Sequence, residues 1–71
     1  MFDRITFDPE ILEGRACVRG LAISVFEITH LMDQGVTTEQ ILQRYPELEA
    51  QDLTQAREYA AWLAQEELAS I

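Results

Sequence analysis

Few residues of this chain are of a type that could do catalysis. His30 is the only histidine, and no cysteine or carboxylate pair stands at metal-ligand spacing around it, which favours a surface or packing role. Cys17 is the only cysteine, and its apolar neighbours predict a small buried side chain rather than a reactive thiol. The 13 acidic residues are scattered in the way of solvated faces. We therefore expect no catalytic residue, no metal site and no cofactor, and a protein that is not an enzyme.

A second group of residues could bind an anion. The segment GRACVRG, residues 14–20, places Arg15 and Arg19 in a loop between two glycines, which lie too far apart for a phosphate-binding loop. If Arg4 lies beside them, three guanidinium groups form a candidate cationic loop. Such a group could meet a carboxylate of another subunit or a nucleic-acid phosphate.

A third group points to protein–protein contact. Trp62 is the only tryptophan, and tryptophan is enriched at the centres of interfaces. Glu58 and Glu66 lie four residues before and after it, so all three share one side of a helix. These residues form a candidate partner interface, and the alternative is a tryptophan lying flat under the stems of polar neighbours.

The N-terminal third of the chain indicates a small β element that would hold the arginines. Residues 4–7 alternate polar and apolar and predict a short strand, and residues 21–25 predict a second one. Between them, Asp8 is a potential cap and Pro9 suits the first helical position, which predicts one helical turn over residues 9–12. We expect the two strands to pair with each other or with a second copy. The β element and its loop occupy about residues 4–25.

The remaining residues predict three helices, at about 25–34, 38–44 and 50–69. Thr37 and Gln40 match a capping box before the second helix. The third helix has a weaker start, because Glu49 stands where serine, threonine or aspartate caps better. We expect a mainly α fold, a three-helix helix-turn-helix-like domain with a short N-terminal two-stranded β element.

The third helix has one apolar face at helical spacing, which consists of Leu53, Ala56, Ala60, Leu63 and Ala64. Trp62 lies nine positions after Leu53, about 180° around the helix. The periodicity therefore predicts that Leu53 is buried in the core and that Trp62 lies on the opposite side.

Size and charge limit the class of protein. The 71 residues make a single domain, and a chain this short gains stability from a partner subunit, so we expect a homodimer. The net charge is −8, and all the cations are arginines. Residues 25–71 carry two arginines against nine acids, which repels nucleic-acid phosphates. The polar N-terminus and the lack of a long apolar run predict a cytoplasmic protein without a membrane span.

The ordered motifs RITFDPEI, GRACVRG, ISV, TTEQILQRYPEL and REYAAWLAQEE, between residues 4 and 67, resemble domain-of-unknown-function family 433. The resemblance implies small, mostly helical domains similar to the antitoxins of bacterial toxin–antitoxin pairs, which often accompany a PIN-like ribonuclease toxin. It implies no catalytic residues.

Two functions from different classes remain open. The first is an antitoxin-like interaction module that binds and masks a ribonuclease-type partner through its acidic helical face. The alternative is a helix-turn-helix DNA-binding transcriptional regulator, with the third helix in the major groove. The acidic charge of that helix disfavours DNA.

Overall fold

The computed structural model describes residues 2–69, and these form three helices after a small β element. In chain order the elements are β1 (Ile5–Thr6), the 3-10 helix η1 (Leu12–Gly14), β2 (Cys17–Val18), α1 (Val25–Asp33), α2 (Thr38–Arg44) and α3 (Ala50–Ala69). This architecture confirms the predicted mainly α fold with an N-terminal two-stranded β element. No helix within residues 2–69 combines the length and the apolar character that crossing a membrane requires.

The β element pairs differently from the prediction. β1 and β2 are antiparallel, with Ile5 opposite Val18 and Thr6 opposite Cys17. The strand predicted over residues 21–25 is wrong, because within it only Ser24 forms a bridge, and its partner is Cys17 rather than β1. β2 therefore lies between β1 and the segment that leads into α1.

A tight turn after β2 explains this arrangement. Arg19 and Gly20 both have positive φ, +48° and +73°, which is the requirement of a type I′ turn. The amide of Leu21 donates to the carbonyl oxygen of Val18 at 2.8 Å and closes the turn. The chain thus reverses direction directly after β2. The residues that follow the turn run back along β2 and do not contact β1 as a strand.

The helical turn predicted over residues 9–12 is also wrong. The Asp8 side chain accepts a hydrogen bond from the amide of Glu10 at 2.9 Å, which forms an Asx-type turn instead. The 3-10 helix η1 follows it, and Leu12 and Glu13 have φ of +49° and +59° within it. A right-handed helical turn cannot continue through left-handed residues.

The first two helices begin at side-chain caps. The hydroxyl of Ser24 accepts from the amide of Glu27 at 3.0 Å at the start of α1. At the start of α2 both hydrogen bonds of the predicted capping box are present, between Thr37 and Gln40. These caps satisfy amides that have no partner within the helix.

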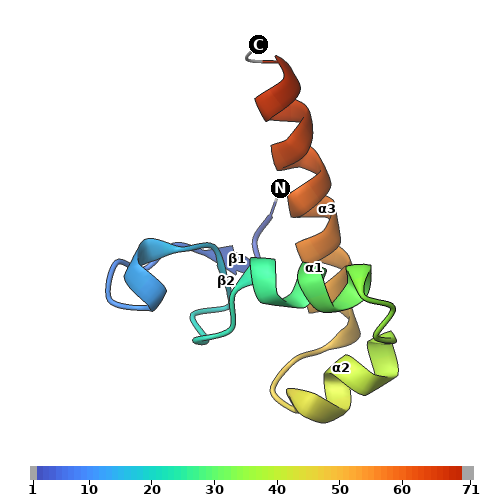
Figure 1. The fold of residues 1–71 in the computed structure, drawn as a ribbon. Coiled ribbons are helices and arrows are strands. Elements are labelled where there is room, and N and C mark those ends of the chain that lie inside the picture. The colour runs from blue at the N-terminus through green and yellow to red at the C-terminus, as the bar shows by residue number, and fades with distance from the viewer. Residues whose placement is uncertain (1, 70–71) are drawn as a thin grey trace.

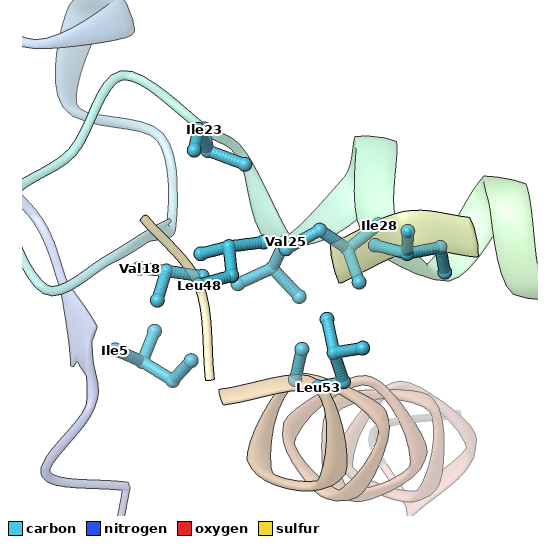
Figure 2. Close-up of a cluster of buried hydrophobic side chains, with 9 residues drawn as sticks. Ile5, Val18, Ile23, Val25, Ile28, Leu48 and Leu53 are labelled. Atoms are coloured by element: carbon cyan, nitrogen blue, oxygen red, sulfur yellow. The ribbon is translucent and has the colours of Figure 1, made fainter. Parts of the chain in front are cut away.

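The hydrophobic core lies where the β element, the three helices and the loop before α3 meet. Its buried side chains are Ile5, Val18, Ile23, Val25, Ile28, Ile41, Leu48, Leu53 and Ala56. Figure 2 shows the labelled members of this cluster directed toward one another between the β element, α1 and the first turns of α3. Leu53 is buried, as the helical periodicity predicts.

α3 is much longer than the elements that pack on it. Figure 1 shows its C-terminal half extending beyond the β element, α1 and α2. The predicted apolar face of α3 therefore divides into two parts. Leu53 and Ala56 lie in the core, whereas Ala60 is half-buried and Leu63 and Ala64 are exposed.

Candidate functional site

The C-terminal half of α3 presents Trp62 at the surface. Its side chain is 45% exposed, and its ring lies 5.7 Å from the ring of Phe2 and 6.0 Å from that of Tyr59. Phe2 also meets Tyr59 edge to face, with ring centroids 5.3 Å apart. Phe2 of the N-terminal segment and Tyr59 of α3 thus contact the indole, and nearly half of the Trp62 side chain remains exposed. Such contacts between aromatic rings order the side chain before any partner arrives.

Acidic residues flank this indole along the helix. Glu58 and Glu66 are both exposed, and each lies one helical turn from Trp62. We call Glu58, Trp62 and Glu66 the Trp62 face. The indole stands against Phe2 and Tyr59, a contact that sequence periodicity alone did not indicate.

Two of the three arginines predicted to form a cationic loop do lie together. Arg4 precedes β1 and Arg19 follows β2, and the amide of Arg19 donates to the carbonyl oxygen of Arg4 at 2.9 Å. Strand pairing therefore brings these residues into contact although 15 positions separate them in the chain. Arg15 belongs to another part of the surface.

Both arginines bind one buried carboxylate. Asp52 has no exposed surface, and its Oδ1 lies 2.7 Å from Nη1 of Arg4. Arg19 approaches it side-on, with Nε 3.0 Å from Oδ1 and Nη2 2.9 Å from Oδ2. The amide of Glu49 also donates to Oδ2 at 2.8 Å. We call Arg4, Arg19, Glu49 and Asp52 the Asp52 network.

The Asp52 network also supplies the helix cap that the sequence seemed to lack. Asp52 is the third residue of α3, and it accepts from the amide of Glu49 just before the helix, which is the return half of a capping box. The carboxylate of Glu49 in turn binds Nη1 of Arg4 at 2.8 Å. One carboxylate thus caps α3 and ties its start to both strands.

Opposing effects set the charge of Asp52. Burial raises the pKa of its carboxyl group, but hydrogen bonds from Arg19, the Glu49 amide and Arg4 outweigh burial and leave the pKa below its ordinary value. Asp52 is therefore ionised at neutral pH. The carboxylate of Asp52 forms ion pairs with Arg4 and Arg19, so both guanidinium groups already have a partner within the protein.

Arg15 lies in a groove between the β element, α1 and α3. The groove has a volume of about 430 Å³ and is lined mostly by apolar side chains, among them Phe7, Phe26 and Leu63. Arg15 is the only charged residue of this lining within the described part of the chain. We call this feature the α1–α3 groove.

Three large apolar side chains stand exposed around the α1–α3 groove. The exposed fractions are 59% for Phe7, 76% for Phe26 and 40% for Leu63. Phe26 stacks on the ring of His30 at 5.8 Å, so the only histidine lies exposed beside an aromatic ring. Exposed apolar groups gathered around one concave surface are typical of an interaction site.

Cys17 has no access to a reaction partner. It is buried in β2, and burial raises the pKa of its thiol, which disfavours the thiolate form. The structure thus places Cys17 with the core, as its apolar neighbours indicate.

The sequence analysis did not predict two features of this region, the role of Asp52 and the α1–α3 groove. Asp52 looked like one of many surface acids, although its place three residues after Glu49 was a signal for a helix cap. The α1–α3 groove had no local signal, because its lining comes from three separate segments.

Comparisons with known proteins agree with the fold. A solved structure of a DUF433 member protein from Anabaena variabilis ATCC 29413 matches with a TM-score of 0.82 at 28% sequence identity. The match covers 90% of this chain and 63% of that one, so the chain spans less than two thirds of the length of that protein. The comparison with curated proteins gave no match.

The family comparison covers most of the folded core. The model of the family described as "Protein of unknown function (DUF433)" matches residues 5–60. The matched segment contains the Asp52 network except Arg4, and it ends two residues before Trp62. By this match the chain belongs to the DUF433 family, as its ordered motifs predicted.

Proposed function

We propose that this protein is a cytoplasmic, non-enzymatic interaction module that binds a protein partner through the Trp62 face. The observation that carries the proposal is a 45% exposed tryptophan, supported by Phe2 and Tyr59 and flanked by two exposed glutamates. An aromatic side chain that is already ordered loses little conformational entropy on binding, and it gains by burial at an interface centre.

Charge indicates the kind of partner. The chain has a net charge of −8, and Glu58 and Glu66 place negative charge on both sides of the indole. Acidic surfaces speed the approach of basic ones and disfavour acidic ones. The partner therefore carries a basic surface with an apolar pocket that admits Trp62.

The specific form of the proposal is antitoxin-like masking of a ribonuclease-type partner. Its support is the family resemblance together with the acidic surface. A protein that handles RNA needs cations for the phosphates, and an acidic module placed over those cations would exclude the substrate. Under this proposal the Trp62 face anchors the complex and its glutamates cover basic residues near the partner's active site.

The charge distribution favours this function over DNA binding. A helix-turn-helix regulator would direct α3 toward phosphates, yet α3 carries Glu58 and Glu66 on its surface. Arg4 and Arg19 are bound to Asp52 and Glu49, which reduces the cations available for phosphate. We therefore treat DNA binding as an alternative outcome of the test.

The test begins with the protein that co-purifies with the untagged chain from its host. We expect Trp62→Ala to raise the dissociation rate of that complex about tenfold or more, because a buried aromatic anchor mainly slows dissociation. Leu12→Ala is the matched control, since Leu12 is 41% exposed and lies outside both the Trp62 face and the α1–α3 groove. A complex equally sensitive to both variants, or to neither, contradicts the proposed face.

Two further measurements test the specific form. The wild-type chain should inhibit RNA cleavage by the purified partner, and Trp62→Ala should inhibit less at equal concentration. Salt-dependent binding to a DNA duplex, without any effect on a protein partner, would instead support the regulator.

A further inference from the structure

The α1–α3 groove is an apolar surface that the chain does not cover by itself. Phe7 and Phe26 stand more than half exposed at its rim, and Leu63 is 40% exposed within it. Figure 1 shows that the C-terminal half of α3, which carries Leu63 and Ala64 of the groove lining, extends past the other elements. We propose that this groove is the interface of a homodimer, in which each copy places the C-terminal half of its α3 against the groove of the other.

The side chains along α3 suit close helix packing. Ala60 and Ala64 lie four residues apart on the groove side, with Leu63 between them. Small residues at this spacing let a second helix approach closely, while the leucine fills the space between the helices. The α3 of a second copy presents the same pattern, so a two-fold axis near Leu63 makes the surface self-complementary.

Charge complementarity identifies the occupant as a second copy. Among residues 2–66, whose side chains are described, Arg15 is the only charged residue that lines the groove, and it forms no ion pair. From Glu58 onward the sequence holds glutamates and no cation. An α3 laid in the groove of another copy therefore brings carboxylates toward Arg15, and the symmetry repeats the pairing on the other side.

Repulsion between two acidic copies is the opposing effect. Each chain has a net charge of −8. This charge is spread over the molecule, and salt at physiological ionic strength screens exposed charges beyond about 8 Å. Contacts made in the groove act at short range, so we expect apolar burial and the Arg15 pairs to outweigh the screened repulsion.

The interface must extend beyond the groove to its rim. An interface of ordinary size covers about 800 Å² on each partner, roughly a sixth of the 5060 Å² accessible surface of this chain. Phe7 and Phe26 supply the exposed apolar surface next to the groove. Trp62 is not part of the lining, so Trp62→Ala and changes within the groove alter different surfaces.

The experiment is sedimentation equilibrium of the purified chain across the micromolar range. We expect a reversible dimer for the wild type. Leu63→Glu should raise the dimer dissociation constant at least about tenfold, because it buries an unpaired carboxylate in the interface. Leu12→Glu is the matched control, since Leu12 is 41% exposed and lies outside the groove, and it should leave the dissociation constant unchanged.

A second pair of variants tests the charge contact. Arg15→Glu should weaken the dimer, whereas Arg57→Glu makes the same charge change at an exposed arginine outside the groove and should not. Circular dichroism of each variant confirms that the helices are retained.

Three results would overturn the proposal. One is a folded monomer at every concentration, and another is a dimer indifferent to both Leu63→Glu and Arg15→Glu. The third is a monomer in which Leu63→Glu abolishes binding of the co-purifying protein, which would assign the groove to that protein instead. The homodimer does not rest on the proposed function, since Trp62→Ala tests that function on a separate surface.

Discussion

At the scale of single residues, Asp52 joins parts of the chain that are distant in sequence. Its carboxylate binds Arg4 and Arg19, which lie 48 and 33 positions away, and it accepts from the Glu49 amide at the start of α3. The side chains of Arg4 and Arg19 remain 23% and 37% exposed. The buried carboxylate therefore relies on the two arginines to compensate its charge, whereas the arginines can also be solvated by water.

We expect Asp52→Asn to lower the free energy of unfolding by about 3 kcal/mol, the lower end of the range for breaking a buried ion pair. The lower end applies because both guanidinium groups are partly exposed and can regain water. Urea unfolding monitored by circular dichroism measures this change. Asp33→Asn is the control, since Asp33 is exposed at the end of α1, and it should change stability by less than about 0.5 kcal/mol. Equal effects of the two variants would contradict the structural role of the network.

The lowered pKa of Asp52 predicts that the stability of the fold depends on pH in the acidic range. Hydrogen bonds to the arginines hold the pKa of Asp52 below its ordinary value despite burial. A lowered pKa in the folded state means that the stabilisation is complete above the unfolded-state pKa of about 3.9, and that it is lost as the pH falls through the folded-state value. The stability difference between wild type and Asp52→Asn should therefore be constant near neutral pH and shrink below about pH 4. A stability difference that grows as the pH falls would contradict a lowered pKa for Asp52 in the folded state.

At the scale of elements, α3 combines three roles along its length. Its first turn carries Asp52, its next turns carry the core residues Leu53 and Ala56, and its C-terminal half carries the Trp62 face and one wall of the α1–α3 groove. The roles follow from which parts of the helix the other elements cover (Figure 1). A helix packed along only half of its length leaves apolar residues such as Leu63 and Ala64 exposed.

We expect Leu53→Ala to lower the free energy of unfolding by about 2–5 kcal/mol, because the side chain is only 2% exposed and its removal leaves a cavity. Trp62→Ala should cost less, since a 45% exposed ring loses fewer buried contacts. Urea melts should compare the two at matched protein concentration, because dimer dissociation would enter the apparent stability. The reverse order would mean that α3 is rotated relative to the core.

The start of α2 gives a second prediction at this scale. Thr37→Ala removes the hydroxyl that accepts from the Gln40 amide and should cost about 1 kcal/mol. Thr38→Ala changes the neighbouring exposed threonine, the first residue of the helix, and should cost less. Thermal unfolding of both variants checks the difference, and equal losses would indicate that the cap is not formed in solution.

At the scale of the whole molecule, the acidic charge and the apolar surfaces have separate effects on binding. In the proposed complex, long-range attraction between opposite charges would mainly set the rate of association, whereas close packing of Trp62 would mainly set the rate of dissociation. The Trp62 face has both kinds of group within two helical turns.

Reversing both Glu58 and Glu66 to arginine should slow association with the co-purifying partner at low salt, and the difference from wild type should fade at high salt. Reversing Glu10 and Glu13, which are exposed in the N-terminal third, makes the same change in net charge away from this face. Stopped-flow binding of both double variants separates local from overall charge. Equal slowing would show that only the net charge matters.

The sequence by itself determined what depends on neighbouring residues. The capping box at Thr37 and Gln40 and the burial of Leu53 follow from spacing along one helix, and the ordered motifs indicated the family. The capping box joins residues three apart, the apolar face with Leu53 repeats at helical spacing along one helix, and the motifs keep their order in the chain, so these patterns are visible in the linear sequence.

The tertiary structure decided what depends on distant segments. Arg19 could have been a free surface cation, but the left-handed turn after β2 places it on Asp52, 33 residues further along. The α1–α3 groove likewise arises only when the β element and α1 pack beside the projecting part of α3. The physical reason is that an ion pair or a groove between remote segments depends on how the chain packs in three dimensions, and no local spacing records that arrangement.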